Sequence, residues 1–442
     1  MDEIKRHSRE QANLLRYVGR WLALVTPLAF LAGAASALFS WLLDLATQTR
    51  LDNPSLLWLL PFGGVFIAAL YRWAGRGTDA GNNLLMESIT AHEQDDSSVV
   101  VPGRMAPLIL VATVITHLFG GSVGREGTAV QMGGAIAARL GRWFRLGTAD
   151  QRILLMAGIS AGFGGIFGTP ITGAIFAMEV LAIGSIRYDA ILPCLLAGLL
   201  SNWTALALGT NHAVVVLPSG MAGGFLPDQL FLSAKVALAA VFFGLASAMF
   251  AALTHWLGGQ FQHRVANPFL RPAMGGIALI AFTLLLGTTD HLGLGTGQIQ
   301  PGRVNIASAF IQDGAKPASW FIKTLATALS LGSGFKGGEV TPLFYIGATL
   351  GNQLAGVFDA PVPLFAALGF VAVFGAATNT PLAGTLLGIE LFGAEYAAMF
   401  AIANFVAYLF SGHKGIYLGQ RIAIPKPGRH NEPKGFSDQQ KQ

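Results

Sequence analysis

The feature that most constrains this chain is a series of long apolar stretches that recurs along its length. These stretches approach or exceed the roughly 20 residues that a helix needs to cross a bilayer. They are residues 21–46, 56–71, 105–119, 150–182, 189–209, 232–256, 273–286, 362–377 and 382–410. Backbone in lipid must bond within helices or a closed barrel, and these stretches are too long and evenly apolar for barrel strands. They therefore predict an all-α integral membrane protein.

The charged residues are few, 12% of the chain against about 25% in an ordinary soluble domain. Basic residues gather before the first apolar stretch and after the last one, which predicts that both termini are cytoplasmic and that the number of crossings is even. This placement explains the net charge of +5 without nucleic acid as a partner. The single cysteine, Cys194, excludes a disulfide framework and a cysteine metal site. The histidines show no metal-ligand spacing, so we expect no metal.

An internal duplication relates the two halves of the chain at a constant offset of 211 residues. Within 22 positions, Gly158, Ala161, Phe163, Gly164, Thr169, Pro170, Gly173 and Glu179 match Gly369, Ala372, Phe374, Gly375, Thr380, Pro381, Gly384 and Glu390. So long a period is typical of a transporter built from two related halves, often of inverted orientation. The halves are about 20–205 and 232–410. We expect a transmembrane domain at 21–411, between a cytoplasmic segment at 1–20 and a short tail at 412–442.

Glycine-rich segments break the apolar pattern in corresponding places of the two halves, at 75–85, 120–134, 287–297 and 332–347. Such breaks at membrane depth are tolerated where they line a protected cavity. Paired breaks in two halves point to a binding site.

The segment 120–128 is the first break that carries chemistry. It reads Gly-Gly-Ser-Val-Gly-Arg-Glu-Gly-Thr and opens a helix-like run. Its glycines bring backbone amides close to a ligand, and the following helix start points its free N–H groups and positive dipole end at the same place. This predicts an anion site. Glu126 lies inside it, and a carboxylate that leaves when protonated can couple a proton to an anion.

Two other interpretations of this segment stay open. One is a plain ion pair between Glu126 and Arg125 in a loop. The other is the nucleophile elbow of a hydrolase, because Gly120-x-Ser122-x-Gly124 fits the G-x-S-x-G pattern. That pattern requires a preceding strand with His and acid partners, and no strand is predicted here. An intramembrane enzyme is therefore the less favoured class.

A counterpart in the second half, at 332–342, again opens an apolar run. Glu339 and Thr341 place a carboxylate and a hydroxyl beside that helix start. Glu339 either caps the helix or acts as an ionisable group at membrane depth. Asn82, in the first glycine-rich break, either offers amide donors to an anion or satisfies a turn. Tyr417 is either an interfacial anchor or a phenol that donates to an anion.

In this order the four segments resemble the motifs of the CLC family of anion channels and exchangers, over roughly residues 20–420. Gly124–Thr128 is similar to the GREGP motif, whose glutamate is the external gate, and implies that role for Glu126. Three further positions fall at the family's pore motifs: Phe335 within the GxFxP segment 334–342, Asn82 at the serine of the GSGIP loop, and Tyr417 at the pore tyrosine.

The departures from the family pattern resemble its bacterial fluoride/proton antiporter branch. Thr128 replaces the usual proline, Asn82 replaces the serine, and the run at 337–342 reads GGEVTP. In chloride/proton exchangers a second, internal glutamate carries the proton. Here Glu179 aligns just before that position, and Val180 occupies it, as in the fluoride branch.

The resemblance implies a CLC-type fold of two inverted-topology repeats with tilted, broken and re-entrant helices. It implies fluoride export driven by protons, in a bacterial inner membrane, by a homodimer with one pathway per subunit and no cofactor. Glu339 is the candidate for a second acidic step. The anion-binding residues would be Asn82, Gly124, Arg125, Gly127, Thr128, Phe335, Thr341 and Tyr417. A chloride/proton exchanger or passive anion channel of the same fold is the alternative.

Overall fold

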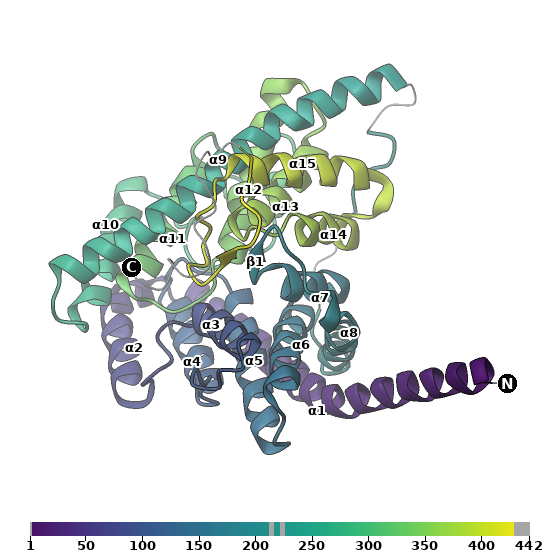
Figure 1. Ribbon diagram of the computed structural model, residues 1–442. Coiled ribbons are helices and arrows are strands. Elements are labelled where there is room, and N and C mark those ends of the chain that lie inside the picture. The colour runs from purple at the N-terminus through teal and green to yellow at the C-terminus, as the bar shows by residue number, and fades with distance from the viewer. Residues whose placement is uncertain (1, 212–215, 222–225, 428–442) are drawn as a thin grey trace.

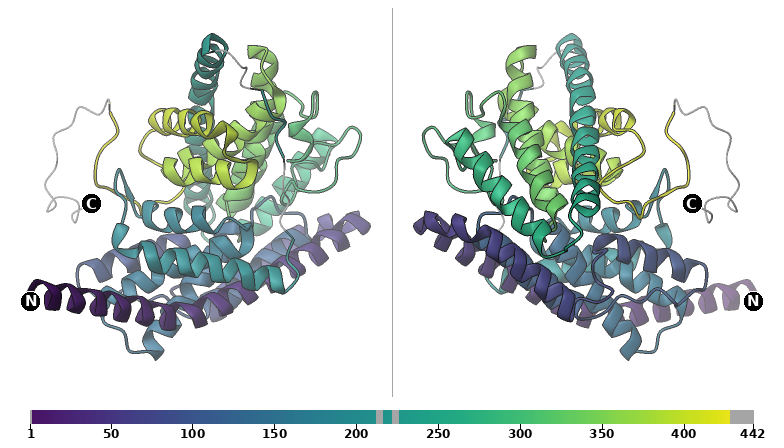
Figure 2. Two further views of the ribbon diagram at one scale, coloured as in Figure 1. Left: turned by 90° about the vertical axis from the view of Figure 1, so that its right-hand side faces the viewer. Right: turned by 90° about the vertical axis from the view of Figure 1, so that its left-hand side faces the viewer.

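The computed structural model describes residues 2–211, 216–221 and 226–427 of the chain. Helices dominate it, and Figure 1 shows the first half, purple to blue, beneath the second half, green to yellow. The two side views in Figure 2 show the same stacking of the halves.

The first half contains α1 (Asp2–Asp52), η1 (Pro54–Leu59), α2 (Leu60–Ala74), α3 (Asn82–Glu93), α4 (Met105–Leu118), α5 (Glu126–Trp143), α6 (Thr148–Phe167), α7 (Pro170–Glu179), η2 (Tyr188–Ala190) and α8 (Ile191–Ala207). The second half contains α9 (Leu226–Arg264), α10 (Leu270–Leu286), η3 (Ser308–Phe310), α11 (Ser319–Ser333), α12 (Val340–Phe358), α13 (Val362–Ala377), α14 (Pro381–Phe392), η4 (Ala394–Tyr396) and α15 (Ala397–Phe410). Two short strands, β1 (Ala182–Ile183) and β2 (Arg421–Ile422), pair in parallel, Ala182 opposite Arg421.

Four helical segments of the described chain are long and apolar enough to cross a membrane. They are Glu10–Asp52, Pro54–Ala74, Tyr188–Ala207 and Pro227–Arg264. Shorter apolar helices follow them in both halves. Several apolar runs of the sequence are therefore split into broken helices. The run 150–182 becomes α6 and α7, separated at Gly168, whose φ of 75° lies in the left-handed region that favours glycine. The run 382–410 becomes α14 and α15.

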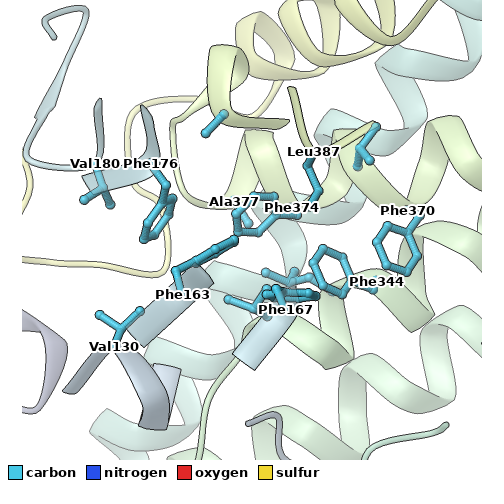
Figure 3. Packing of buried hydrophobic residues seen from close by; sticks show 14 of the residues in the cluster. Val130, Phe163, Phe167, Phe176, Val180, Phe344, Phe370, Phe374, Ala377 and Leu387 are labelled. Carbon is cyan, nitrogen blue, oxygen red and sulfur yellow. The ribbon is translucent and has the colours of Figure 1, made fainter. Parts of the chain in front are cut away.

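The duplication in the sequence reappears as contacts between equivalent residues. Phe163 of α6 and Phe374 of α13 are related by the offset of 211, and their ring centroids lie 6.2 Å apart. Phe176 of α7 stacks on both rings, at 5.0 Å and 5.8 Å. Figure 3 shows these aromatic rings meeting in the apolar centre between the two halves. Equivalent residues of the two repeats therefore pack against each other in one central aromatic cluster.

Each half also contains helix pairs in very close contact at glycine residues. A Cβ added to Gly133 of α5 would lie 2.1 Å from the carbonyl oxygen of Gly158 in α6. In the second half, a Cβ on Gly347 of α12 would lie 2.0 Å from the carbonyl oxygen of Gly369 in α13. Small residues allow this close approach of helices in membranes. These contacts fix α5 and α12, whose N-termini form the site described next.

Candidate functional site

The glycine-rich breaks at 120–134 and 332–347 meet at the centre of the molecule. Gly124 and Gly338 form an isolated antiparallel bridge, with Gly124 N donating to Gly338 O at 2.5 Å and Gly338 N donating to Gly124 O at 2.8 Å. A Cβ on Gly338 would lie 2.6 Å from the amide nitrogen of Gly127, so a side chain does not fit there. Both breaks are shorter than the ranges 120–134 and 332–347 expected from the sequence, because α5 already begins at Glu126 and α12 at Val340. The bridge brings both helix starts to one point.

The Glu126 carboxylate lies at the junction of the two helix starts. Its side chain is 1% exposed, and its Oε2 accepts hydrogen bonds from Thr341 N at 2.9 Å and from the Thr341 hydroxyl at 2.5 Å. The ion pair with Arg125 also exists, with Nε to Oε1 at 3.3 Å. The carboxylate therefore occupies the N-terminus of α12, where free N–H groups and the helix dipole favour an anion.

A second carboxylate and an amide flank Gly127, one residue after Glu126. A Cβ on Gly127 would lie 3.1 Å from Asn82 Nδ2 and 3.4 Å from Glu339 Oε2. Glu339 is the N-cap residue of α12 but makes no side-chain capping bond, so the capping interpretation is wrong. Among the described residues, Glu339 Oε2 and Asn82 Oδ1 are buried without a hydrogen-bond partner. Asn82 begins α3 and presents its donor nitrogen to this point.

Tyr417 joins the site from the segment after α15. It is 5% exposed and lies close enough to Glu126 and Glu339 for their charges to act on its hydroxyl. It therefore does not serve as an anchor at the membrane surface. A cavity of about 10 Å³ lies beside it, and is lined by Asn82, Leu85, Met86, Val130, Ile159, Phe176, Val180 and Tyr417. This volume is close to the space of one water molecule.

Two of the expected site residues are directed elsewhere. The Thr128 hydroxyl pairs with the Thr113 hydroxyl of α4 at 2.8 Å. The Phe335 ring belongs to a separate apolar cluster, with residues of α2, α4, α10 and α11. Ser122, the residue of the nucleophile-elbow pattern, bonds its hydroxyl to that of Thr327 at 2.9 Å.

One positioning residue was missed in the sequence. Asn83 Oδ1 accepts a hydrogen bond from Gly419 N at 3.0 Å, which ties the start of α3 to the segment that carries Tyr417. This bond links the segments that carry Asn82 and Tyr417, which both line one cavity. The sequence indicates Asn83 only through the two consecutive asparagines after Gly81. Its partner, Gly419, lies 336 residues away, so the bond is visible only in the fold.

Comparison with known proteins agrees with these motifs. The family profile described as voltage gated chloride channel matches residues 63–412. The "Chloride/fluoride channel protein" of Pseudomonas syringae pv. tomato is 46% identical over 424 residues, which cover 96% of this chain and 90% of that protein. The solved structure of a CLC-type fluoride/proton antiporter, 36% identical, matches with a TM-score of 0.84 over 92% of this chain and 98% of that one.

A slow cyanobacterial Cl⁻/H⁺ antiporter shares the fold at 19% identity, with a TM-score of 0.71 over 90% of this chain and 96% of that one. The predicted fold class is thus confirmed. The family profile spans most of the chain, and the segment that resembles the family's gate motif forms the start of α5, which faces the start of α12. The chain therefore belongs to the CLC family of voltage-gated chloride channels and transporters, as its motifs predicted.

Proposed function

We propose that this protein is a proton-coupled fluoride exporter, a fluoride/proton antiporter. The observation that carries the proposal is the Glu126 carboxylate at the start of α12, where it accepts two hydrogen bonds from Thr341. A carboxylate and a small anion compete for these donors. Protonation removes the charge of Glu126, so its carboxyl group leaves the start of α12 and the anion binds there instead. One side chain thus couples proton binding to anion binding. The relatives named for fluoride support the choice of anion.

The second acidic step is assigned to Glu339. Its Oε2 is buried without a partner in the described chain, and it faces Gly127 directly after the gate. An ionisable group at such a depth is costly and marks an ion or proton pathway. Val180 stands at the position of the internal proton glutamate of chloride/proton exchangers, and a valine carries no proton. The proton route therefore runs through Glu126 and Glu339.

The donors and the space at the site favour fluoride. Fluoride is small and strongly hydrated, so a protein site must replace its water with hydrogen-bond donors at close range. Thr341 offers an amide and a hydroxyl, Asn82 an amide nitrogen, and Tyr417 a phenol. The adjoining cavity of about 10 Å³ leaves little room for a larger anion. Confinement with several donors is the physical basis for selectivity over chloride.

The setting proposed is a bacterial inner membrane, with both termini cytoplasmic and export driven by proton entry. The basic residues at both ends support this orientation. A homodimer with one pathway per subunit is proposed from the family. Cross-linking in mild detergent measures this directly, and a clean monomer in membranes and in detergent would contradict the homodimer.

Proteoliposomes with a controlled proton gradient test the function. The wild-type protein should move fluoride and protons in opposite directions, with much less chloride flux. Glu126→Gln should abolish proton movement, because the glutamine cannot exchange a proton. Glu87→Gln, a change at an exposed residue of α3, is the matched control and should transport as the wild type does. Proton pumping against a fluoride gradient by Glu126→Gln would refute the gate, and equal chloride and fluoride flux would favour a chloride/proton exchanger or passive channel.

A further inference from the structure

A cluster of basic side chains surrounds Gly293, in the loop after α10 on the side of the molecule where α1 ends. The Lys323 side chain is fully buried, and its Nζ donates to the carbonyl oxygens of His291 at 3.0 Å and Gly293 at 2.7 Å. A Cβ added to Gly293 would lie 3.4 Å from Arg50 Nη2 and 3.8 Å from His117 Nδ1. Three basic groups, from α1, α4 and α11, thus converge on one residue.

Several hydrogen-bond donors of this basic cluster have no acceptor in the described chain. The His117 side chain is 1% exposed, and neither of its ring nitrogens has a hydrogen-bond partner in the described chain. Arg50 Nε is also buried without a partner, and no described carboxylate forms an ion pair with Arg50 or Lys323. The nearby acid, Asp290, lies 3.9 Å from Lys316 instead. An unsatisfied buried polar group destabilises the folded state, so the arrangement indicates a ligand that accepts hydrogen bonds.

The chemistry of the donors selects the class of ligand. A guanidinium, an imidazole N–H and an ammonium, whose Nζ also lies 5.4 Å from the centroid of the Tyr345 ring, together favour a small anion. Arg303 is exposed and lies close enough for its charge to act on Arg50, which extends the positive region toward solvent. Lys323 is held by two carbonyl oxygens and so has a structural role as well. Arg50 Nε has no such structural partner in the described chain, and the His117 ring has only the backbone of Gly124 within electrostatic reach as an acceptor.

A line of buried polar groups joins this cluster to the gate loop. Lys323, Thr327 and Ser330 lie at i, i+4 and i+7 of α11, which places them on one helix face. The hydroxyls of Thr327 and Ser330 bond Ser122, which lies in the loop that ends at the start of α5, four residues before Glu126. His117 lies near the backbone of Gly124, two residues before the gate. Buried polar side chains therefore extend from the segment before Glu126 to Lys323.

We propose that Arg50, His117 and Lys323 form an accessory anion site, which holds the transported anion between the gate and the solvent at the face where α1 ends. This inference rests on the proposed function for the identity of the anion, fluoride. The site itself requires only a small monovalent anion. It raises the local anion concentration beside the gate, as clefts lined by one sign of charge do.

Transport kinetics in oriented proteoliposomes test the site, with fluoride offered at the face where α1 ends. Arg50→Gln should raise the fluoride concentration for half-maximal transport by about threefold to tenfold with little change in maximal rate, because the lost charge lowers local anion concentration. His117→Phe should raise it as well, and Arg50→Lys should raise it less than Arg50→Gln does, because lysine keeps the charge but not the guanidinium donors. Arg16→Gln is the control, since Arg16 lies on the same helix about 50 Å away along its axis. Gel filtration checks folding.

Crystals of the wild-type protein in bromide give a readout that does not depend on transport. An anomalous peak between Arg50 and His117, lost in Arg50→Gln, is the expected result. Unchanged half-maximal fluoride concentrations in folded Arg50→Gln and His117→Phe, together with no peak, would overturn the accessory site. Failure of the proposed function looks different: the wild type would not transport fluoride, while the bromide peak would remain.

Discussion

Glu179 and Glu390 occupy equivalent positions of the two repeats, and each binds the start of a helix in the opposite half. Glu179 accepts hydrogen bonds from the amides of Leu382 and Ala383, at 3.1 Å and 2.9 Å. Glu390 accepts from the amides of Ile171 and Thr172, at 3.0 Å and 2.7 Å. These are the free N–H groups at the starts of α14 and α7. The exchange is reciprocal, so the two carboxylates hold the repeats together about the central aromatic cluster.

We expect Glu390→Gln to lower the stability of the folded protein by about 1 kcal/mol, because a carboxylate at a helix N-terminus is stabilised by the helix dipole and its free amides. The glutamine keeps one acceptor oxygen and loses the charge. Thermal unfolding in detergent measures the change, and Glu87→Gln at an exposed position of α3 is the control. A melting temperature equal to that of the control would mean that Glu390 does not contribute to joining the halves.

The Thr341 hydroxyl is expected to hold the gate closed. Thr341→Val removes one of the two hydrogen bonds that Thr341 gives to Glu126 and keeps the backbone amide. Hydrogen bonds to charged groups contribute about 1.5–3 kcal/mol, so the carboxylate should leave its place more readily. Fluoride should then leak without protons, and the ratio of protons to fluoride should fall.

Simultaneous recording of proton and fluoride flux in proteoliposomes checks that ratio. Thr349→Val is the matched control, because the Thr349 hydroxyl bonds the backbone of Tyr345 within the same helix. Thr341→Ser keeps the hydroxyl and should stay close to wild type. A wild-type ratio of protons to fluoride in Thr341→Val would mean that the backbone amide of Thr341 alone is enough to hold Glu126 in place.

We expect Glu339→Gln to reduce fluoride turnover about tenfold or more, because a positioned proton-transfer group contributes on the order of 10²–10⁴-fold where it acts. The glutamine is nearly the same size, so the packing beside Gly127 should survive. Initial rates of fluoride efflux measure the loss. Asp79→Asn is the control, since the Asp79 side chain is 72% exposed and only approaches Lys336 at 3.8 Å. Near wild-type efflux in Glu339→Gln would move the second proton step to another group.

The sequence predicted the helical membrane fold and the helix start at Glu126 because both depend on local or periodic signals. The offset of 211 identified Glu179 and Glu390 as equivalent, and the glycines before Glu126 predicted a helix start that binds an anion. The crossed capping by the two glutamates was not predictable, since their partners lie 203 and 218 residues away. The same holds for Phe335, which matches a pore motif in sequence but packs against α2. A sequence motif indicates the type of residue at a position, whereas long-range packing in the fold decides which way its side chain points.

Asn82 is expected to set the preference for fluoride over chloride. Its amide nitrogen lies beside Gly127, and its side chain lines the cavity of about 10 Å³ together with Tyr417. Asn82→Ser replaces the amide with a smaller hydroxymethyl group, which widens the site and removes a donor. The larger, less hydrated anion gains from the added space, whereas fluoride loses a group that replaced its water. The ratio of chloride to fluoride efflux should rise.

Efflux of both anions from liposomes with equal protein incorporation measures this ratio. Asn202→Ser, the same chemical change in α8, controls for the loss of an amide outside the site. If Asn82 only satisfied the turn before α3, Asn82→Ser would lower the melting temperature and leave the ratio unchanged. That result would place selectivity on Thr341 and Tyr417, which contribute the remaining side-chain hydroxyls around the gate carboxylate. A raised ratio in a protein of wild-type stability would instead identify the width of the site at Asn82 as the feature that discriminates the two anions.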